Sequence, residues 1–193
     1  MFRVLAQLFG WSSSRQSEQH ELFVHEDDWS QIELLPAAVA AWCTDEMRRI
    51  GVFAEQQRVS GGHGWSDIYV RADPPTTLAH MHLDFSGACT ALHARLPRFS
   101  VVTSGTFSSP QPVPRVAAFG PARHAGIVLV PDNGGALVAG ATLILHGTAG
   151  DNAAVLAAAA TLPSEAALIV ADWMRGRIVD ASDRTAIERY LQG

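Results

Sequence analysis

Residues 21–54 read ELFVHEDDWSQIELLPAAVAAWCTDEMRRIGVFA, and this stretch decides the fold class. Its first part predicts a strand at 21–25, an acidic turn at 26–28 and a returning strand at 31–35. Pro36 can then open a helix, because the N–H group that proline lacks has no partner at a helix start. Apolar side chains recur at three- and four-residue steps through this helix, which indicates one buried stripe. Its members are Val39, Trp42, Cys43, Met47, Ile50, Phe53 and Ala54.

Downstream of this unit, strands and helices mix without the regular alternation that builds a parallel sheet. The predicted strands cover 65–71, 78–84, 99–103, 115–119, 126–130, 136–146, 167–171 and 177–180. Short helices are predicted to begin near Ser86, near Asp151 or Asn152, and near Asp183. We therefore expect an α+β fold, with a mixed or antiparallel sheet and helices packed on it.

The domain organisation follows from the same pass along the chain. Residues 21–193 are expected to form a single α+β domain, after an N-terminal leader at residues 1–20 that could contain a short helix. No apolar run approaches the roughly 20 residues needed to span a membrane. The two cysteines form neither a disulfide framework nor a CxxC metal pair. Free thiols suit the reducing environment of the cytoplasm, which is the expected location.

Charge and motifs narrow the function classes further. The formal net charge of −5 repels nucleic-acid phosphates, so nucleic acid is not an expected partner. The sequence has no nucleophile elbow, no P-loop and no dinucleotide-binding loop, and nothing in it indicates a cofactor. Cys89 and His93 could pair a nucleophile with a base on a helix, but Cys89 shares its face with Leu92 and Leu96. A buried, inert thiol is therefore the preferred interpretation.

Acidic residues concentrate early in the chain, with eight of the 19 carboxylates at residues 21–55. The turn at 26–28 precedes a tryptophan, which would combine steering charge with an aromatic anchor. A second acidic and aromatic segment lies at 65–71, where Ile68 and Val70 alternate with polar residues as in a half-buried strand. The sequence leaves open the alternative of a solvated turn whose tryptophan packs inward. The predicted partner-binding residues are Glu26, Asp27, Asp28, Trp29, Trp65, Asp67 and Tyr69.

The segment VHEDDWSQIELLP at 24–36, with GWSDIYVR at 64–71, resembles a bacterial family of uncharacterised proteins. Those proteins are similar to immunity proteins of polymorphic-toxin and secretion systems. The resemblance covers residues 22–71 and carries no catalytic residues with it. It implies a non-enzymatic binding protein that occludes a toxin encoded nearby. A structural scaffold subunit remains an alternative, and the sequence does not define the oligomeric state.

A second resemblance supports a different alternative, a degenerate metal-dependent hydrolase. HMHLDFSG at 80–87 resembles the HxHxDH motif of the metallo-β-lactamase fold, and RHAGIVL at 123–129 resembles its second metal-histidine segment. On a strand, the two histidines and the aspartate of the first motif would project from one face. Phe85 and Ala141 stand where the family has a further histidine and a bridging aspartate, so the ligand set is incomplete. The alternative metal ligands are His80, His82, Asp84 and His124.

Overall fold

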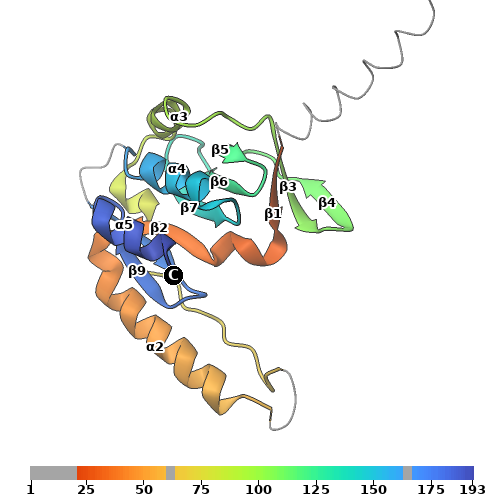
Figure 1. Ribbon diagram of the computed structural model, residues 1–193, viewed down its shortest axis with the longest axis vertical. Coiled ribbons are helices and arrows are strands. Elements are labelled where there is room, and N and C mark those ends of the chain that lie inside the picture. The colour runs from red at the N-terminus through yellow and green to blue at the C-terminus, as the bar shows by residue number, and fades with distance from the viewer. Residues whose placement is uncertain (1–20, 60–63, 163–166) are drawn as a thin grey trace, which may run out of the picture.

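An antiparallel sheet of six strands forms the centre of the protein (Figure 1). Its strand order is β5 (Ala117–Ala122), β6 (Ala125–Pro131), β7 (Val138–Leu145), β2 (Ile32–Pro36), β8 (Leu168–Asp172) and β9 (Arg177–Asp180). A smaller sheet holds β1 (Glu21–His25), β3 (Val101–Thr106) and β4 (Ser109–Pro112), in that order. This computed structural model describes residues 21–59, 64–162 and 167–193, so the predicted leader at 1–20 lies outside the described residues. The predicted α+β arrangement is confirmed.

The central strands carry apolar side chains on both faces because both faces are covered. The α-helices of the described part are α2 (Ala40–Gln56), α3 (Phe85–His93), α4 (Ala149–Ala159) and α5 (Arg184–Leu191). The last three share one hydrophobic core with the face of the sheet that carries Leu34. On the opposite face, the small sheet covers one half, where Leu22 meets Val128, and the start of α2 covers the other half, where Cys43 meets Ile169. The protein therefore has three layers, and its middle layer is the six-stranded sheet.

The strands β1 and β2 do not form the predicted hairpin. β1 pairs in parallel with β3, whereas β2 pairs with β7 and β8 in the large sheet. The segment between them is a 3-10 helix, η1 (Glu26–Ser30), closed by a capping box. In that box the backbone N–H of His25 donates to the Asp28 carboxylate, and His25 Nδ1 accepts from the N–H of Asp27, both at 3.3 Å. The extra turn carries the chain from one sheet to the other.

Two further strand predictions are wrong. Residues 65–71 pair only through an isolated bridge between Trp65 and Arg58, within the described part of the chain. The predicted strand at 78–84 begins as a 3-10 helix, η3 (Leu78–Met81). Thr77 precedes η3 as its cap, and its backbone N–H donates to Nδ1 of His80 at 3.1 Å. In both segments, local polar contacts replace the backbone hydrogen bonds that a strand makes with its neighbours.

The helix starts differ slightly from those predicted. Asp84 caps α3 by accepting from the N–H of Gly87, and Thr148 caps α4 by accepting from the N–H of Asp151. A short 3-10 helix, η2 (Ala37–Val39), begins just after Pro36, and α2 follows it from Ala40. The last helix begins at Asp183 as predicted, and Asp183 caps α5 by accepting from the N–H of Ala186 at 3.0 Å.

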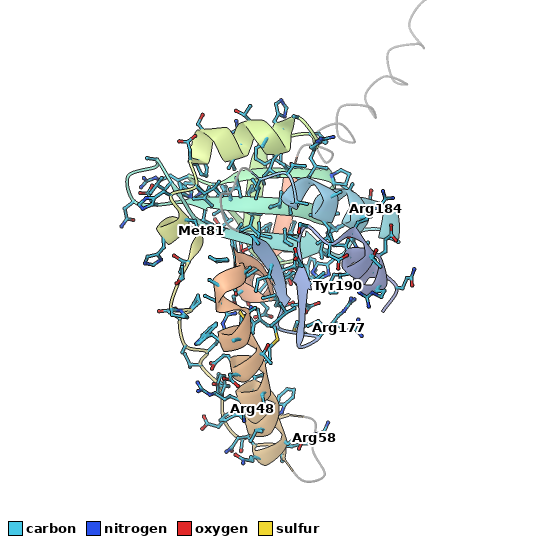
Figure 2. The ribbon with its side chains drawn as sticks, turned by 90° about the vertical axis from the view of Figure 1, so that its left-hand side faces the viewer. Arg48, Arg58, Met81, Arg177, Arg184 and Tyr190 are labelled. Atoms are coloured by element: carbon cyan, nitrogen blue, oxygen red, sulfur yellow. The ribbon has the colours of Figure 1, made fainter. Side chains whose placement is uncertain are left out.

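The helix α2 projects away from the sheets, and the chain returns along it (Figure 1). We call α2 with residues 57–59 and 64–77 the arm, and we call residues 64–77 its return segment. Val39 and Cys43 at the start of the helix are buried against the sheet, whereas Phe53 is only partly buried and packs edge-on against Tyr69 of the return segment at 5.3 Å. Figure 2 shows Arg48 partway along the arm and Arg58 near its tip.

Tyr190 fastens α5 to the central sheet (Figure 2). Its hydroxyl donates to Oδ2 of Asp172 at 2.7 Å, and both residues are buried. Oδ1 of the same carboxylate accepts from the backbone N–H of Arg175 at 2.9 Å. Burial, followed by the hydrogen bond and negative charge of Asp172, raises the pKa of Tyr190, so the phenol remains a donor at neutral pH.

We expect Tyr190→Phe to lower the free energy of unfolding by about 1–3 kcal/mol, because a buried carboxylate oxygen would lose its donor. Urea denaturation at neutral pH measures the change. Arg184→Gln is the control in the same helix, since it removes an exposed pair with Glu188 that contributes roughly 0.5 kcal/mol or less. Equal losses in the two variants would show that the Tyr190 hydroxyl does not fasten the helix.

Candidate functional site

The return segment of the arm exposes apolar side chains and turns polar ones inward. Ile68 and Val70 are 84% and 85% exposed, and Trp65 is 61% exposed. Tyr69 and Arg71, which alternate with them, are each hydrogen bonded to a carboxylate of the body or of α2. The alternation predicted from the sequence is therefore present at 68–71, where its faces are reversed: Ile68 and Val70 are exposed, and Tyr69 and Arg71 point inward. Asp67 is exposed as well.

A buried carboxylate in α2 imposes this orientation. Glu46 is only 1% exposed, and its Oε1 accepts from the hydroxyl of Tyr69 at 2.9 Å and from the backbone N–H of Ala72 at 3.2 Å. Its Oε2 accepts from Arg49 at 3.2 Å. Burial raises the pKa of Glu46, but the donors from Tyr69, Ala72 and Arg49 outweigh burial and hold the pKa below its ordinary value. The charged carboxylate thus fastens the return segment to the helix.

A second polar cluster lies at the root of the arm. Oε2 of Glu33 on β2 accepts from Arg71 at 2.6 Å and from the indole N–H of Trp173 at 2.7 Å. The Arg71 guanidinium lies 4.0 Å above the Trp173 ring, and Trp42 of α2 meets that ring edge-on at 6.0 Å. Burial raises the pKa of the nearby Cys43 thiol to about 11, so this thiol is protonated and unreactive at neutral pH. The cluster is therefore a structural joint between β2, α2, the return segment and the β8–β9 turn.

A hollow of about 350 Å³ opens beside this joint, and we call it the root hollow. Its walls come from η1, β2, β6, β7, η3 and the return segment. Its lining combines Leu35, which packs in the core beneath α2, with Leu34, Leu78 and Ala141, which belong to the core on the other face of the sheet. Trp29 and Asp73 both line it, so it connects the acidic turn to the arm.

The acidic turn is only partly free for a partner. Glu26 and Asp27 are exposed, whereas the Asp28 carboxylate is 14% exposed and its Oδ2 lies 3.3 Å from Nε2 of His146. Trp29 packs against the core of the small sheet, and its indole N–H donates to Oγ of Ser104 at 2.6 Å. Trp29 is therefore packed inward, as in the alternative that the sequence left open, and its part in binding a partner stays a prediction.

The predicted partner-binding residues consequently separate into two sets. The exposed set consists of Glu26, Asp27, Trp65 and Asp67. The set that holds the fold consists of Asp28, Trp29 and Tyr69. The exposed pairs lie on different elements, η1 and the arm, and the root hollow lies between those elements. Binding by the exposed residues stays a prediction.

The alternative metal ligands are not assembled. Among the residues that the structure describes, no group of three or more His, Cys, Asp or Glu side chains could hold a metal ion. His80 lies in η3 with its Nδ1 accepting from Thr77, and His82 follows with a left-handed φ of 51°. Asp84 is occupied in capping α3, and His124 is in the turn between β5 and β6. The strand geometry on which the zinc-hydrolase alternative depended is absent from this segment.

The thiol alternative also lacks the electrostatics of a nucleophile. Burial, together with the charge of Asp84, raises the pKa of Cys89 against the opposing effect of Arg98. A reactive thiol needs the opposite shift. His93 is exposed and its ring lies 6.3 Å from that of Phe119.

Comparison with known proteins does not extend these observations. The sequence matches no protein-family model, and no curated protein or solved structure is detectably similar to it. The resemblances to immunity proteins and to the metallo-β-lactamase fold therefore stay predictions. None of the helices within 21–59, 64–162 and 167–193 is long and apolar enough to cross a membrane.

We expect Glu46→Gln to destabilise the protein in a pH-dependent way. The pKa of Glu46 is lower in the folded state than its ordinary value of 4.5, so its charge stabilises the folded state above that value. This contribution is lost as the pH falls through the folded pKa. The difference in free energy of unfolding between wild type and variant should therefore be largest at pH ~7 and shrink below pH ~4.

Urea denaturation at a series of pH values measures this difference. Glu55→Gln is the matched control, because Glu55 is an exposed carboxylate on the same helix. A difference for Glu46→Gln that does not vary with pH would contradict the assigned role of its charge.

Proposed function

We propose that this protein is a non-enzymatic binding protein, and most concretely an immunity-type inhibitor that occludes a toxin protein in the bacterial cytoplasm. The arm and the exposed part of the acidic turn, Glu26 and Asp27, form its docking surface. The arm supplies apolar contact, and the acidic turn attracts a basic partner surface. Both cysteines are free thiols, which supports the cytoplasmic location.

One observation carries the proposal: the return segment displays Ile68 and Val70 to solvent while Glu46 is buried beneath it. This reverses the usual distribution, in which charged side chains are exposed and β-branched apolar ones are buried. Trp65, Val52 and Val59, which are 61%, 47% and 44% exposed, are further exposed apolar side chains of the same arm. An exposed apolar surface of this kind marks an interaction site, and a tryptophan is the side chain most enriched among dominant contacts.

The partner proposed is a protein with a basic surface, because no arginine of the described residues pairs with the exposed carboxylates of the acidic turn, Glu26 and Asp27. The Asp27 side chain is 75% exposed, and its Oδ2 lies 3.4 Å from Nδ1 of His25. Within the described residues, neither the Glu26 nor the Asp27 carboxylate accepts a hydrogen bond that holds the fold. These charges are therefore available for long-range attraction.

We expect the double substitution Ile68→Asp and Val70→Asp to abolish docking without loss of stability. Both side chains point to solvent, so their replacement removes contact area and leaves the core intact. Affinity for the partner that wild type captures from its own cells should fall at least about a hundredfold. Titration of the purified pair by calorimetry gives the affinity, and thermal melting tests the fold.

The matched control is Met174→Asp, which places the same charge at a 71% exposed apolar residue in the β8–β9 turn. This control should keep wild-type affinity. Equal binding by the arm variant would overturn the proposal. If wild type forms a stable dimer that the arm variant dissociates, and binds no other partner, the arm mediates self-association. The protein would then be a scaffold subunit instead of an inhibitor.

Charge reversal of the acidic turn should change the rate of docking more than its lifetime. Glu26→Arg with Asp27→Arg is expected to slow association roughly tenfold at low salt and to have little effect at high salt. Asp28 is left unchanged because it pairs with His146. Stopped-flow mixing with the purified partner measures the rate, and an unaltered association rate would remove the acidic turn from the docking surface.

A further inference from the structure

The root hollow combines an apolar wall with two carboxylates. Leu35 and Val130 supply apolar surface, while Glu33 and Asp73 supply negative charge. Arg71 is the positive residue among those that line the hollow, so one negative charge remains in excess. Such a cavity matches a ligand group with an aliphatic stem and a cationic head.

Glu33 presents one oxygen that the fold does not use. The bonds from Arg71 and Trp173 both reach Oε2, and no hydrogen bond between described residues reaches Oε1. Asp73 is exposed at the rim, and no ion pair or hydrogen bond joins its carboxylate to another described residue. Oε1 of Glu33 and the Asp73 carboxylate could therefore both accept hydrogen bonds from a cation in the hollow.

The wall of the hollow leaves room for such a group. Gly140 on β7 lines it, and a Cβ atom added at Gly140 would meet nothing within 4 Å. Trp29 lines the hollow as well, with its indole N–H already bonded to Ser104 and its carbonyl accepting from Thr142 at 2.7 Å. These bonds fix Trp29 in place at the edge of the hollow.

The geometry points to the root hollow as the receptor for one basic side chain, arginine or lysine, of the docked partner protein. Its stem lies along Leu35 and Val130, and its head lies between Oε1 of Glu33 and Asp73. The inference rests on the proposed function, since the partner supplies the side chain. It adds the specificity element that an apolar arm lacks, because a hydrophobic surface alone distinguishes poorly between partners.

The test uses the protein alone and a small probe. N-acetyl-arginine amide is titrated into ¹⁵N-labelled protein, and the indole signal of Trp29 and the amide signal of Gly140 are followed by NMR. A saturable shift with a millimolar Kd is expected, as suits a ligand this small. N-acetyl-norleucine amide, which has a similar stem and no charge, should give none.

Variants locate the site. Gly140→Leu should abolish the arginine shift by filling the hollow, and Asp73→Asn should weaken binding about tenfold. Gly150→Leu and Glu188→Gln make the same changes outside the hollow and should bind as wild type does. Asp73→Asn at an exposed residue keeps the test valid if Gly140→Leu does not fold.

Absence of a saturable shift, or equal binding by Gly140→Leu and Asp73→Asn, would overturn the inference. Affinity measurements with the partner protein distinguish this failure from a failure of the proposed function. If Gly140→Leu keeps full affinity for the partner while Ile68→Asp with Val70→Asp loses it, docking on the arm stands and the receptor role of the hollow is wrong.

Discussion

A single carboxylate oxygen joins the arm to the body. Oε2 of Glu33 accepts from both Arg71 and Trp173, and this joins the central sheet, the return segment and the β8–β9 turn at one point. The Arg71 guanidinium stacked on Trp173 and the edge-on Trp42 pack around this joint. Glu46 repeats the arrangement farther along α2, where its carboxylate holds Tyr69 and Ala72. With both carboxylates in place, the return segment cannot turn its apolar side chains inward.

Much of the fold could be predicted from local pattern. The central strands are long apolar runs, and α2 has a clear helical period, so their existence follows from sequence. The hairpin of β1 and β2 was predicted wrongly because a turn pattern does not state which sheet receives the next strand. Ile68 to Arg71 do alternate as predicted. An alternation with a period of two residues shows only that the segment has two faces, and it does not show which face is buried. Glu46, inside the apolar stripe three residues after Cys43, decided which face was buried, and its position was the available signal.

The candidate site was predictable in part for the same reason. Exposure of Glu26 and Asp27 follows from three successive acids in a turn, since so many charges cannot all be buried. The inward position of Trp29 depends on Ser104 and Thr142, which lie far away in sequence. The root hollow is lined by η1, β2, β6, β7, η3 and the return segment, which lie far apart in sequence, and no local pattern encodes such a meeting.

The separation of the arm's outer face from the three hydrophobic clusters has an evolutionary consequence. Ile68 and Val70 belong to none of the clusters that stabilise the body, whereas the residues that orient them are Glu33, Glu46, Tyr69 and Arg71. Substitutions at the outward positions can therefore accumulate without lowering the stability of the fold. A lineage could retain the inner polar framework and vary the outer residues freely, so recognition could diverge rapidly among descendants that share one scaffold.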